Sequence, residues 1–453
     1  MASSEEELKS LQRDIRKAGV DDPVENTRRN SERLNALVTH ARTHSTYFAE
    51  LYRGLPDEVQ SVAELPVTNK AELMASFDDW VTDPRITRGT VEQFLADSDA
   101  AGSKFLGEYL LTVSSGTTGT PGYFVTDRFA MQVARALGVR ERRPSMIEIA
   151  RIVKRGRRIA VISTDTGHRM ARALLRWQQA EAGGGQQARL FPVDSPLDDL
   201  VDQLNDYDPA VLTGYASAVA LLAGEQVTGR LRISPVVVRP VAEGMSEAMT
   251  RLVSQAWRAP VINTYGANEC LSIARECAAG RMHLNSDWVI LEPVDRNGAP
   301  TPPGEPSHSS VLTTLFRRVQ PIVRYELGDS ITMDIAPCKC GNRLPAFTVT
   351  GRMADFLEFS GPQGTVRIPP LLITSAVDAV APRAQYQIVV ESPDRVALRL
   401  RVPTGDDRDA AADAAVGRLR ELLTDRGLHS VAVVDTGEAP RRSTGGKFLR
   451  VVR

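Results

Sequence analysis

The sequence lacks the features that mark nucleic-acid-binding, membrane and secreted proteins. It has no basic excess, because 55 lysines and arginines are matched by 56 acidic residues, which gives a formal net charge of -1. Broad binding to nucleic acid or to an anionic membrane needs such an excess, so we expect neither partner. No apolar run approaches the roughly 20 residues of a membrane-spanning helix. Residues 1–8 are polar and acidic, unlike a secretory signal, so we expect a cytoplasmic protein.

Cysteine is also scarce, with four residues in the whole chain. A cytosolic chain of 453 residues does not need disulfides to fold. Cys338 and Cys340 are separated by one residue, and Cys277 and His283 precede them in the chain. Three thiolates and one imidazole form a ligand set that suits a tetrahedral structural zinc ion. The alternative is that these are four unrelated residues in a reducing compartment.

The middle of the chain predicts a parallel sheet. A length of 453 residues indicates two or three domains, and 42% hydrophobic with 25% charged residues is an ordinary globular composition. Between residues 157 and 262, short apolar runs alternate with helical patterns. This alternation favours an α/β fold with a parallel sheet covered on both faces. Ligands of such sheets bind in loops beyond the carboxyl ends of the strands.

The pattern changes twice toward the C-terminus. Beyond residue 283 the sequence is rich in turns and short strands, and residues 385–402 then predict a hairpin followed by a helix over 406–426. We therefore expect a large, multi-layer α/β N-terminal region with mainly parallel sheets over residues 1–351. A small, mobile α+β C-terminal domain would occupy residues 352–453.

A glycine-rich loop gives the strongest local signal. Residues 114–122 read Ser-Ser-Gly-Thr-Thr-Gly-Thr-Pro-Gly. Glycines let the backbone turn its N–H groups toward an anion, and the hydroxyls add adaptable donors for phosphate oxygens. The alternative is a flexible polar linker. The loop is not a Walker loop, since G-x-x-x-x-G-K-[ST] is absent.

Three further segments carry side chains that suit a nucleotide. Tyr265, at the end of a predicted strand, offers a ring for a purine, and Glu269 offers a carboxylate for Mg²⁺; a structural turn is the alternative. Asp329 can accept both ribose hydroxyls, unless it merely pairs with Arg324 on the surface. Lys447 follows two glycines and can reach developing negative charge, although chain ends usually fray.

In this order and spacing the segments resemble the motifs of the adenylate-forming superfamily. This superfamily comprises acyl-CoA synthetases, peptide-synthetase adenylation domains and luciferase, and the phenylacetate–CoA ligase branch is the most similar. The resemblance covers essentially the whole chain, from Leu65-Pro66-Val67-Thr68-Asn69-Lys70 to Gly446-Lys447. Some relatives in that branch share the Cys…His…Cys-x-Cys arrangement, whereas Cys270 would lie near the nucleotide.

The resemblance implies a role for each matching residue. Catalysis would involve Lys447 on the substrate oxygen and phosphate, Glu269 on Mg²⁺, Thr117 in the phosphate loop, and His168 on the substrate side. ATP would be bound through its phosphates, adenine and ribose by a longer set: Ser114, Ser115, Gly116, Thr118, Gly119, Ala242, Glu243, Gly244, Asn263, Tyr265, Gly266, Ala267, Asp329 and Arg352.

The implied reaction joins AMP to a small, aromatic carboxylic acid and then transfers the acyl group to coenzyme A.

Three residues differ from those that are usual in the family motifs. Thr120 and Asn268 stand where a lysine and a hydroxyl residue are usual, and Ala354 replaces the first aspartate of the hinge. The hinge supports rotation of the small domain, so the second half-reaction has alternatives. The alternatives are an amine acceptor, activation of nitrite in place of the acid in secondary metabolism, and a non-catalytic nucleotide-binding relative. A homodimer also stays open.

Replacing Lys447 tests its implied role in adenylation. Removing a donor that neutralises transition-state charge typically costs about 2.7–4 kcal/mol. We expect Lys447→Ala to slow adenylate formation roughly a hundredfold or more, with ATP affinity nearly intact. The measurement is ATP–pyrophosphate exchange, and wild-type exchange in the variant would contradict the role.

Overall fold

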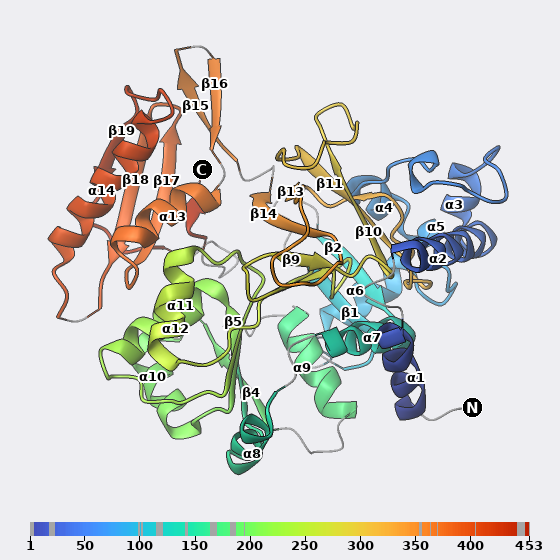
Figure 1. The fold of residues 1–453 in the computed structure, drawn as a ribbon, viewed down its shortest axis with the longest axis horizontal. Helices are drawn as coiled ribbons and strands as arrows, with labels where there is room; N and C mark the ends of the chain where they lie inside the picture. The colour runs from blue at the N-terminus through green and yellow to red at the C-terminus, as the bar shows by residue number, and fades with distance from the viewer. Residues whose placement is uncertain are drawn as a thin grey trace. The chain divides into compact units, whose positions relative to one another are not determined.

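The computed structural model describes most of the chain, which is drawn from blue at the N-terminus to red at the C-terminus in Figure 1. The described residues are 4–17, 23–97, 100, 103–114, 121–140, 144–163, 170–181, 187–193, 195–352, 356–362, 364–368, 370–403, 405–441 and 449–452. Residue contacts divide the chain into two compact units. The first unit comprises Met1–Ser145, Asp165–Gly185 and Asn263–Val349, and the second comprises Met146–Thr164, Gln186–Ile262 and Thr350–Arg453.

The first unit combines helices with small antiparallel sheets. Its helices are α1 (Ser4–Lys17), α2 (Pro23–His44), α3 (Thr46–Leu51), η1 (Val62–Glu64), α4 (Lys70–Ala75), α5 (Phe77–Trp80), α6 (Arg88–Ala96), α7 (Arg128–Ala136), η2 (Leu137–Arg140) and α9 (Met170–Glu181). Its strands are β1 (Leu110–Ser114), β2 (Gly122–Thr126), β7 (Thr264–Tyr265), β8 (Ala274–Glu276), β9 (Met282–Leu284), β10 (Val289–Val294), β11 (Ser309–Thr314), β12 (Tyr325–Glu326), β13 (Asp329–Met333) and β14 (Ala346–Arg352).

The sheets of the first unit bring distant segments together. β1 pairs with β2, β10 with β11 and β12, and a five-stranded sheet has the order β13-β14-β9-β8-β7. One core joins this sheet to the N-terminal helices, and its largest fully buried side chain is Trp80. Trp80 also donates its indole N–H to the Pro321 carbonyl at 2.7 Å, which fixes α5 beside the segment that follows β11.

The second unit contains the expected parallel sheet, with the order β4-β3-β5-β6. Its strands are β3 (Ile159–Ser163), β4 (Ala188–Pro192), β5 (Val211–Tyr215) and β6 (Val237–Val241), and its helices are α8 (Met146–Lys154), α10 (Leu197–Tyr207), α11 (Ala216–Val227) and α12 (Glu247–Trp257). The α/β class is therefore confirmed. The strand pairings described in the first unit are antiparallel instead, apart from an isolated parallel bridge between Thr68 and Tyr325, because turns rather than helices connect its short strands.

The C-terminal residues of the second unit form an α+β arrangement. They comprise β15 (Leu357–Gly361), β16 (Gly364–Ile368), α13 (Pro370–Val380), β17 (Gln385–Ser392), β18 (Arg395–Arg401), α14 (Arg408–Thr424), β19 (Ala432–Asp435) and β20 (Val451–Val452). A four-stranded sheet has the order β19-β18-β17-β20, with β17 and β18 antiparallel as the sequence predicts. A separate mobile domain starting after Gly351 stays a prediction.

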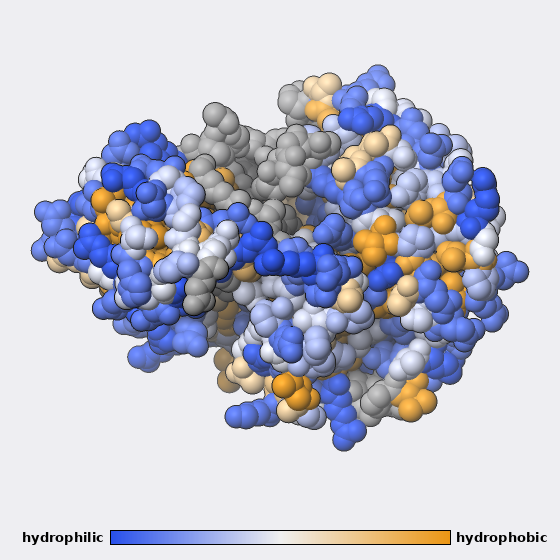
Figure 2. Space-filling model, turned by 90° about the horizontal axis from the view of Figure 1, so that it is seen from above, coloured by the Kyte–Doolittle hydropathy of each residue, from blue (hydrophilic) through white to orange (hydrophobic). Residues whose placement is uncertain are grey.

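The surface is that of a globular protein. On the face shown in Figure 2, hydrophilic residues cover most of the surface and apolar residues form small patches between them. Among the described residues, none of the helices has the length and apolar composition that crossing a membrane requires.

A buried polar cluster ties α13 to α12 within the second unit. Asp378 accepts hydrogen bonds from Ser246 Oγ at 2.8 Å, from the Tyr386 hydroxyl at 2.7 Å and from Arg450. The Arg450 guanidinium also lies 4.4 Å from the centre of the Tyr386 ring. Asp378 is 4% exposed, so its charge is compensated almost entirely by these three partners.

Removing the Asp378 carboxylate should destabilise the second unit strongly. Asp378→Ala leaves the largely buried Arg450 guanidinium unpaired, which typically costs about 3–5 kcal/mol. We expect a loss of that size in the free energy of unfolding measured with urea. The control is Asp413→Ala on the exposed side of α14, which should change it by less than about 0.5 kcal/mol. Equal stabilities of the two variants would contradict the role of the cluster.

Candidate functional site

The glycine-rich loop connects the two strands of a hairpin. β1 and β2 are antiparallel, and Ser114 is paired with Gly122 at the end where the loop leaves. The Ser114 hydroxyl accepts from the Gly122 N–H at 3.1 Å. A Cβ atom at Gly122 would lie 2.8 Å from Ser114 Oγ and 2.9 Å from Lys70 Cε, so a larger residue there would have to displace these side chains. The expected phosphate-binding residues Ser115, Gly116, Thr117, Thr118 and Gly119 lie outside the described residues.

The segment after Tyr265 forms a tight turn. Ala267 and Cys270 exchange backbone hydrogen bonds of 2.8 and 3.1 Å. A Cβ atom at Gly266 would lie 2.6 Å from the Leu271 carbonyl oxygen, which explains the glycine. Asn263, just before β7, is buried, and its carbonyl accepts from the Glu276 N–H at 3.1 Å. The turn therefore gives Glu269 a fixed backbone.

Cys270 belongs to the hydrophobic core beneath this turn. It is 1% exposed, and burial raises the pKa of its thiol to about 12. A thiol that stays protonated is a poor nucleophile and a poor metal ligand. Cys270 thus has a packing role next to Glu269.

Glu269 is buried and held by a tyrosine. The carboxylate is 7% exposed, and its Oε1 accepts a hydrogen bond of 2.8 Å from the hydroxyl of Tyr325 in β12. Among the described residues, Oε2 has no hydrogen-bond partner. A buried carboxylate with one satisfied oxygen fits a cation ligand, since the second oxygen gains most from a positive charge.

Asp329 is held by the tyrosine of the other motif. Asp329 begins β13 and is 6% exposed, and the Tyr265 hydroxyl donates to its Oδ2. The Tyr265 ring packs edge-to-face on Phe347, with centroids 5.9 Å apart. The alternative ion pair between Arg324 and Asp329 does not form. The Arg324 guanidinium instead lies 3.1 Å from both carboxylate oxygens of Glu292.

These bonds curl the five-stranded sheet. β7, which contains Tyr265, and β13, which begins with Asp329, lie at opposite edges of that sheet. Four strand spacings of about 4.8 Å would separate the edges of a flat sheet by roughly 19 Å. A side-chain hydrogen bond between the edges therefore requires this sheet to be strongly curved.

A buried arginine supports the Glu269 turn from below. Arg317 is 2% exposed, and its guanidinium donates to the Val125 carbonyl at 2.8 Å, to Thr126 Oγ1 at 3.0 Å and, weakly, to the Asn268 carbonyl at 3.5 Å. Burial lowers the pKa of this guanidinium. Its described acceptors are all neutral, so Arg317 connects β2, which follows the phosphate loop, to the turn that carries Glu269.

The other expected nucleotide residues belong to the second unit. Ala242, Glu243 and Gly244 follow β6 at its carboxyl end, where ligands of parallel sheets bind. Ala242 has a φ of +65°, a left-handed conformation that a residue with a side chain adopts at a cost. Glu243 accepts from the Ser217 N–H at 2.8 Å. Arg352 ends β14, and His168 and Lys447 lie outside the described residues.

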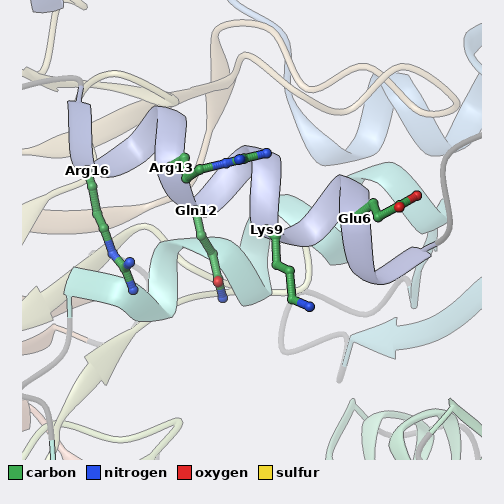
Figure 3. A pocket seen from close by; sticks show the side chains of 5 residues that line it. All are labelled: Glu6, Lys9, Gln12, Arg13 and Arg16. Carbon is green, nitrogen blue, oxygen red and sulfur yellow. The ribbon is translucent and has the colours of Figure 1, made fainter.

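Two cavities differ in how well they can position a ligand. One of about 320 Å³ lies within the second unit and is lined by Tyr215, Glu243, Met249 and Arg450 among others. Its walls come from several elements, as in most small-molecule sites. The other, of about 400 Å³, is lined by Glu6, Lys9, Gln12, Arg13 and Arg16 alone, which all extend from α1 in Figure 3. One helix offers no second wall to hold a ligand.

The four metal-binding candidates come together in the first unit. Ligand atoms of Cys277, His283, Cys338 and Cys340 all lie within 4.8 Å of one another. The Cys277 and Cys338 sulfurs are 3.7 Å apart, and Cys340 Sγ lies 3.3 Å from His283 Nε2. Zinc–sulfur bonds of about 2.3 Å in a tetrahedron place two sulfurs roughly 3.8 Å apart, so the residues fit this ion.

Neighbouring hydrogen bonds orient these ligands. His283 Nδ1 lies 3.0 Å from the Leu344 carbonyl, which can only accept, so Nδ1 carries the proton and Nε2 presents its lone pair. The Asn342 N–H donates to Cys340 Sγ at 3.4 Å. The cluster joins the β8–β9 turn to the connection between β13 and β14.

The sequence patterns missed the roles of Tyr325 and Arg317. A signal for Tyr325 was present, because it precedes Asp329 by four positions, as Tyr265 precedes Glu269. Arg317 carries no comparable local signal, since its partners Val125, Thr126 and Asn268 are distant in the sequence.

Comparisons with known proteins agree with this architecture. No family model matches the chain. The chain is 27% identical over 375 residues to the phenylacetate–coenzyme A ligase of Thermus thermophilus, which covers 75% of this chain and 79% of that protein. A crystal structure of 2-hydroxyisobutyryl-CoA ligase in the postadenylation state has a TM-score of 0.65 at 19% identity, over 93% of this chain and 88% of the other. The anthranilate CoA ligase AuaEII with anthranoyl-AMP has a TM-score of 0.52 at 15% identity, over 75% of this chain and 64% of the other.

In its fold and in the order of its motifs, the chain is similar to ligases of the adenylate-forming superfamily. Within this superfamily, the chain is similar to the phenylacetate–coenzyme A ligase branch, as the motif order predicts.

Proposed function

We propose that the protein activates a small, aromatic carboxylic acid as its acyl-adenylate and transfers the acyl group to coenzyme A. The observation that carries this proposal is the pair of hydrogen bonds that links two distant motifs: the Tyr325 hydroxyl donates to Glu269, the Tyr265 hydroxyl donates to Asp329, and both acids are buried. Buried carboxylates are suited to binding a nucleotide and its cation, because ribose hydroxyls and Mg²⁺ are favourable partners for carboxylate oxygens.

The first half-reaction is an attack on phosphorus. A carboxylate oxygen of the acid bonds to the α-phosphorus of ATP, the bond from that phosphorus to the bridging oxygen breaks, and pyrophosphate leaves. Lys447 neutralises charge on the transferring group, Thr117 and its loop neighbours donate N–H and O–H groups to the phosphates, and Asp329 orients the ribose. When bound at Glu269, Mg²⁺ supplies positive charge for the phosphate oxygens.

The second half-reaction needs a nucleophile. The thiol sulfur of coenzyme A bonds to the acyl carbon, AMP departs with the electron pair, and the thiol proton passes to solvent. The cavity of about 320 Å³ beside Tyr215 and Glu243 is large enough for a small acid or for the arm of an acceptor. The small domain after Gly351 would rotate between the half-reactions, and His168 would contact the substrate.

Ala354 leaves two alternatives to the coenzyme A step. It replaces the first hinge aspartate of the family, so rotation for a coenzyme A step has lost one support. An amine acceptor would make the protein an amide synthetase. Adenylation of nitrite in place of the acid, followed by transfer to an amine, would make it an N–N-forming ligase.

The activity is tested by ATP–pyrophosphate exchange with a panel of carboxylic acids and nitrite, followed by product analysis with coenzyme A or amines. We expect exchange with aromatic acids and thioester formation with coenzyme A. Exchange with no acid, together with intact ATP binding, would favour the non-catalytic relative.

Asp329→Ala tests the ribose contact. Hydrogen bonds to a charged group contribute about 1.5–3 kcal/mol, so the Kd of both ATP and AMP should rise roughly tenfold to a hundredfold. Calorimetry measures both constants. The control is Glu326→Ala, an exposed acid of the same motif, which should leave them unchanged. An unchanged AMP Kd in Asp329→Ala would refute this role.

The second part of the proposal is one structural zinc ion held by Cys277, His283, Cys338 and Cys340. Four protein ligands leave no open position, so the ion would stabilise the fold without joining the reaction. It would fasten the β8–β9 turn, which follows the Glu269 segment, to the loop after Asp329.

Zinc content provides the test. We expect about one zinc per chain in protein purified without chelators, as tetrahedral sites hold one ion. Cys338→Ser should lose zinc and stability first and activity second. Cys270→Ala is the matched control and should keep its zinc. Substantially less than one zinc in the wild type, with the three cluster thiols open to a thiol reagent, would mean that they are ordinary cysteines.

A further inference from the structure

The two nucleotide motifs share a pattern that becomes visible only in the fold. In each, a tyrosine precedes a carboxylate by four residues, as Tyr265 precedes Glu269 and Tyr325 precedes Asp329. Each tyrosine hydroxyl is bonded to the acid of the other motif. The Tyr325 hydroxyl donates to Glu269, 56 positions away, and the Tyr265 hydroxyl donates to Asp329, 64 positions away.

We propose that this reciprocal exchange makes Tyr325 and Tyr265 positioning residues with separate functions: Tyr325 sets the magnesium affinity of Glu269, and Tyr265 sets the ribose affinity of Asp329. The proposal rests on the proposed function. Each tyrosine thus orients the carboxylate of the other motif and not the carboxylate of its own.

Burial makes these hydrogen bonds effective. Tyr325 is 3% exposed and Glu269 is 7% exposed, so little water competes for the carboxylate. A phenol hydroxyl that donates to Oε1 removes one rotational freedom of the carboxylate and directs Oε2 away from Tyr325. Because the Glu269 carboxylate is already oriented, binding of a metal ion does not include the cost of ordering that side chain. Loss of such a supporting hydrogen bond typically lowers metal affinity by about 10–100-fold.

The pair of Tyr265 and Asp329 acts on ribose binding and not on metal binding. The Tyr265 hydroxyl donates a hydrogen bond to Oδ2 of Asp329, and the Tyr265 ring packs edge-to-face against Phe347. Asp329 at the start of β13 is thereby oriented toward hydroxyl donors such as those of ribose. AMP carries that ribose but needs no magnesium, so the two bonds are distinguishable by ligand.

The competing explanation is that both bonds only brace the curled sheet. Bracing predicts that loss of either hydroxyl lowers stability and weakens all ligands alike. Tyrosine-to-phenylalanine changes remove one oxygen and keep the rings, so they test this explanation directly.

The experiment measures binding by calorimetry for AMP and for a non-hydrolysable ATP analogue over a range of Mg²⁺ concentrations. In Tyr325→Phe we expect the Mg²⁺ concentration for half-maximal analogue binding to rise about tenfold or more, with AMP affinity unchanged. In Tyr265→Phe we expect AMP and analogue affinities to fall together by roughly tenfold, with the Mg²⁺ requirement unchanged.

Tyr109→Phe is the matched control. Tyr109 is 6% exposed, and its hydroxyl donates to Asp83 Oδ2 at 2.6 Å, so the variant loses a bond of the same kind in the same unit. It should lower thermal stability comparably and alter neither AMP affinity nor the Mg²⁺ requirement.

The outcomes distinguish this proposal from the proposed function. A wild-type protein that binds neither AMP nor the analogue would overturn the proposed function. A wild-type protein that binds both, with Tyr325→Phe and Tyr265→Phe behaving like Tyr109→Phe, would overturn only the reciprocal exchange, as would equal effects of either variant on both ligands. If Tyr325→Phe does not fold, the Tyr265→Phe result decides.

Discussion

The hydrogen bond from Tyr265 to Asp329 closes the five-stranded sheet of the first unit, and the geometry of the candidate site depends on that closure. It joins the two edge strands of the sheet, β7 and β13. The bond from Tyr325 to Glu269 makes a second connection between the same two motifs. The cysteine–histidine cluster brings the β8–β9 turn of this sheet together with the connection between β13 and β14.

The support beneath the site is polar, although apolar packing would be more stabilising. Arg317 keeps a guanidinium in the interior with only neutral acceptors described around it, and burying such a charge is expensive. Its contacts fix β2 and the Asn268 carbonyl in one orientation. Ala242 adds a strained left-handed backbone at the end of β6. Costs of this kind are typical of functional sites, where geometry matters more than stability.

Local patterns predicted the elements whose partners are nearby in the sequence. The hairpin predicted over residues 385–402 is β17 and β18, and the helix predicted over 406–426 is α14 (Arg408–Thr424), because apolar periodicity and turn residues act locally. Strands of two or three residues, such as β7 and β12, form through pairing with distant segments and leave no such pattern. The motifs indicated that Glu269 and Asp329 belong to the same site. They could not show which tyrosine donates to which acid, because that depends on how the sheet brings distant strands together.

The crossed arrangement has a consequence for recombination between related genes. A crossover anywhere between residues 270 and 324 separates Tyr265 and Glu269 from Tyr325 and Asp329, and so divides both hydrogen bonds at once. A chimaera would inherit each hydroxyl from one parent and its acceptor from the other. A chimaera would therefore keep both bonds only where the two parents share this exchange, although the chain keeps the two motifs far apart.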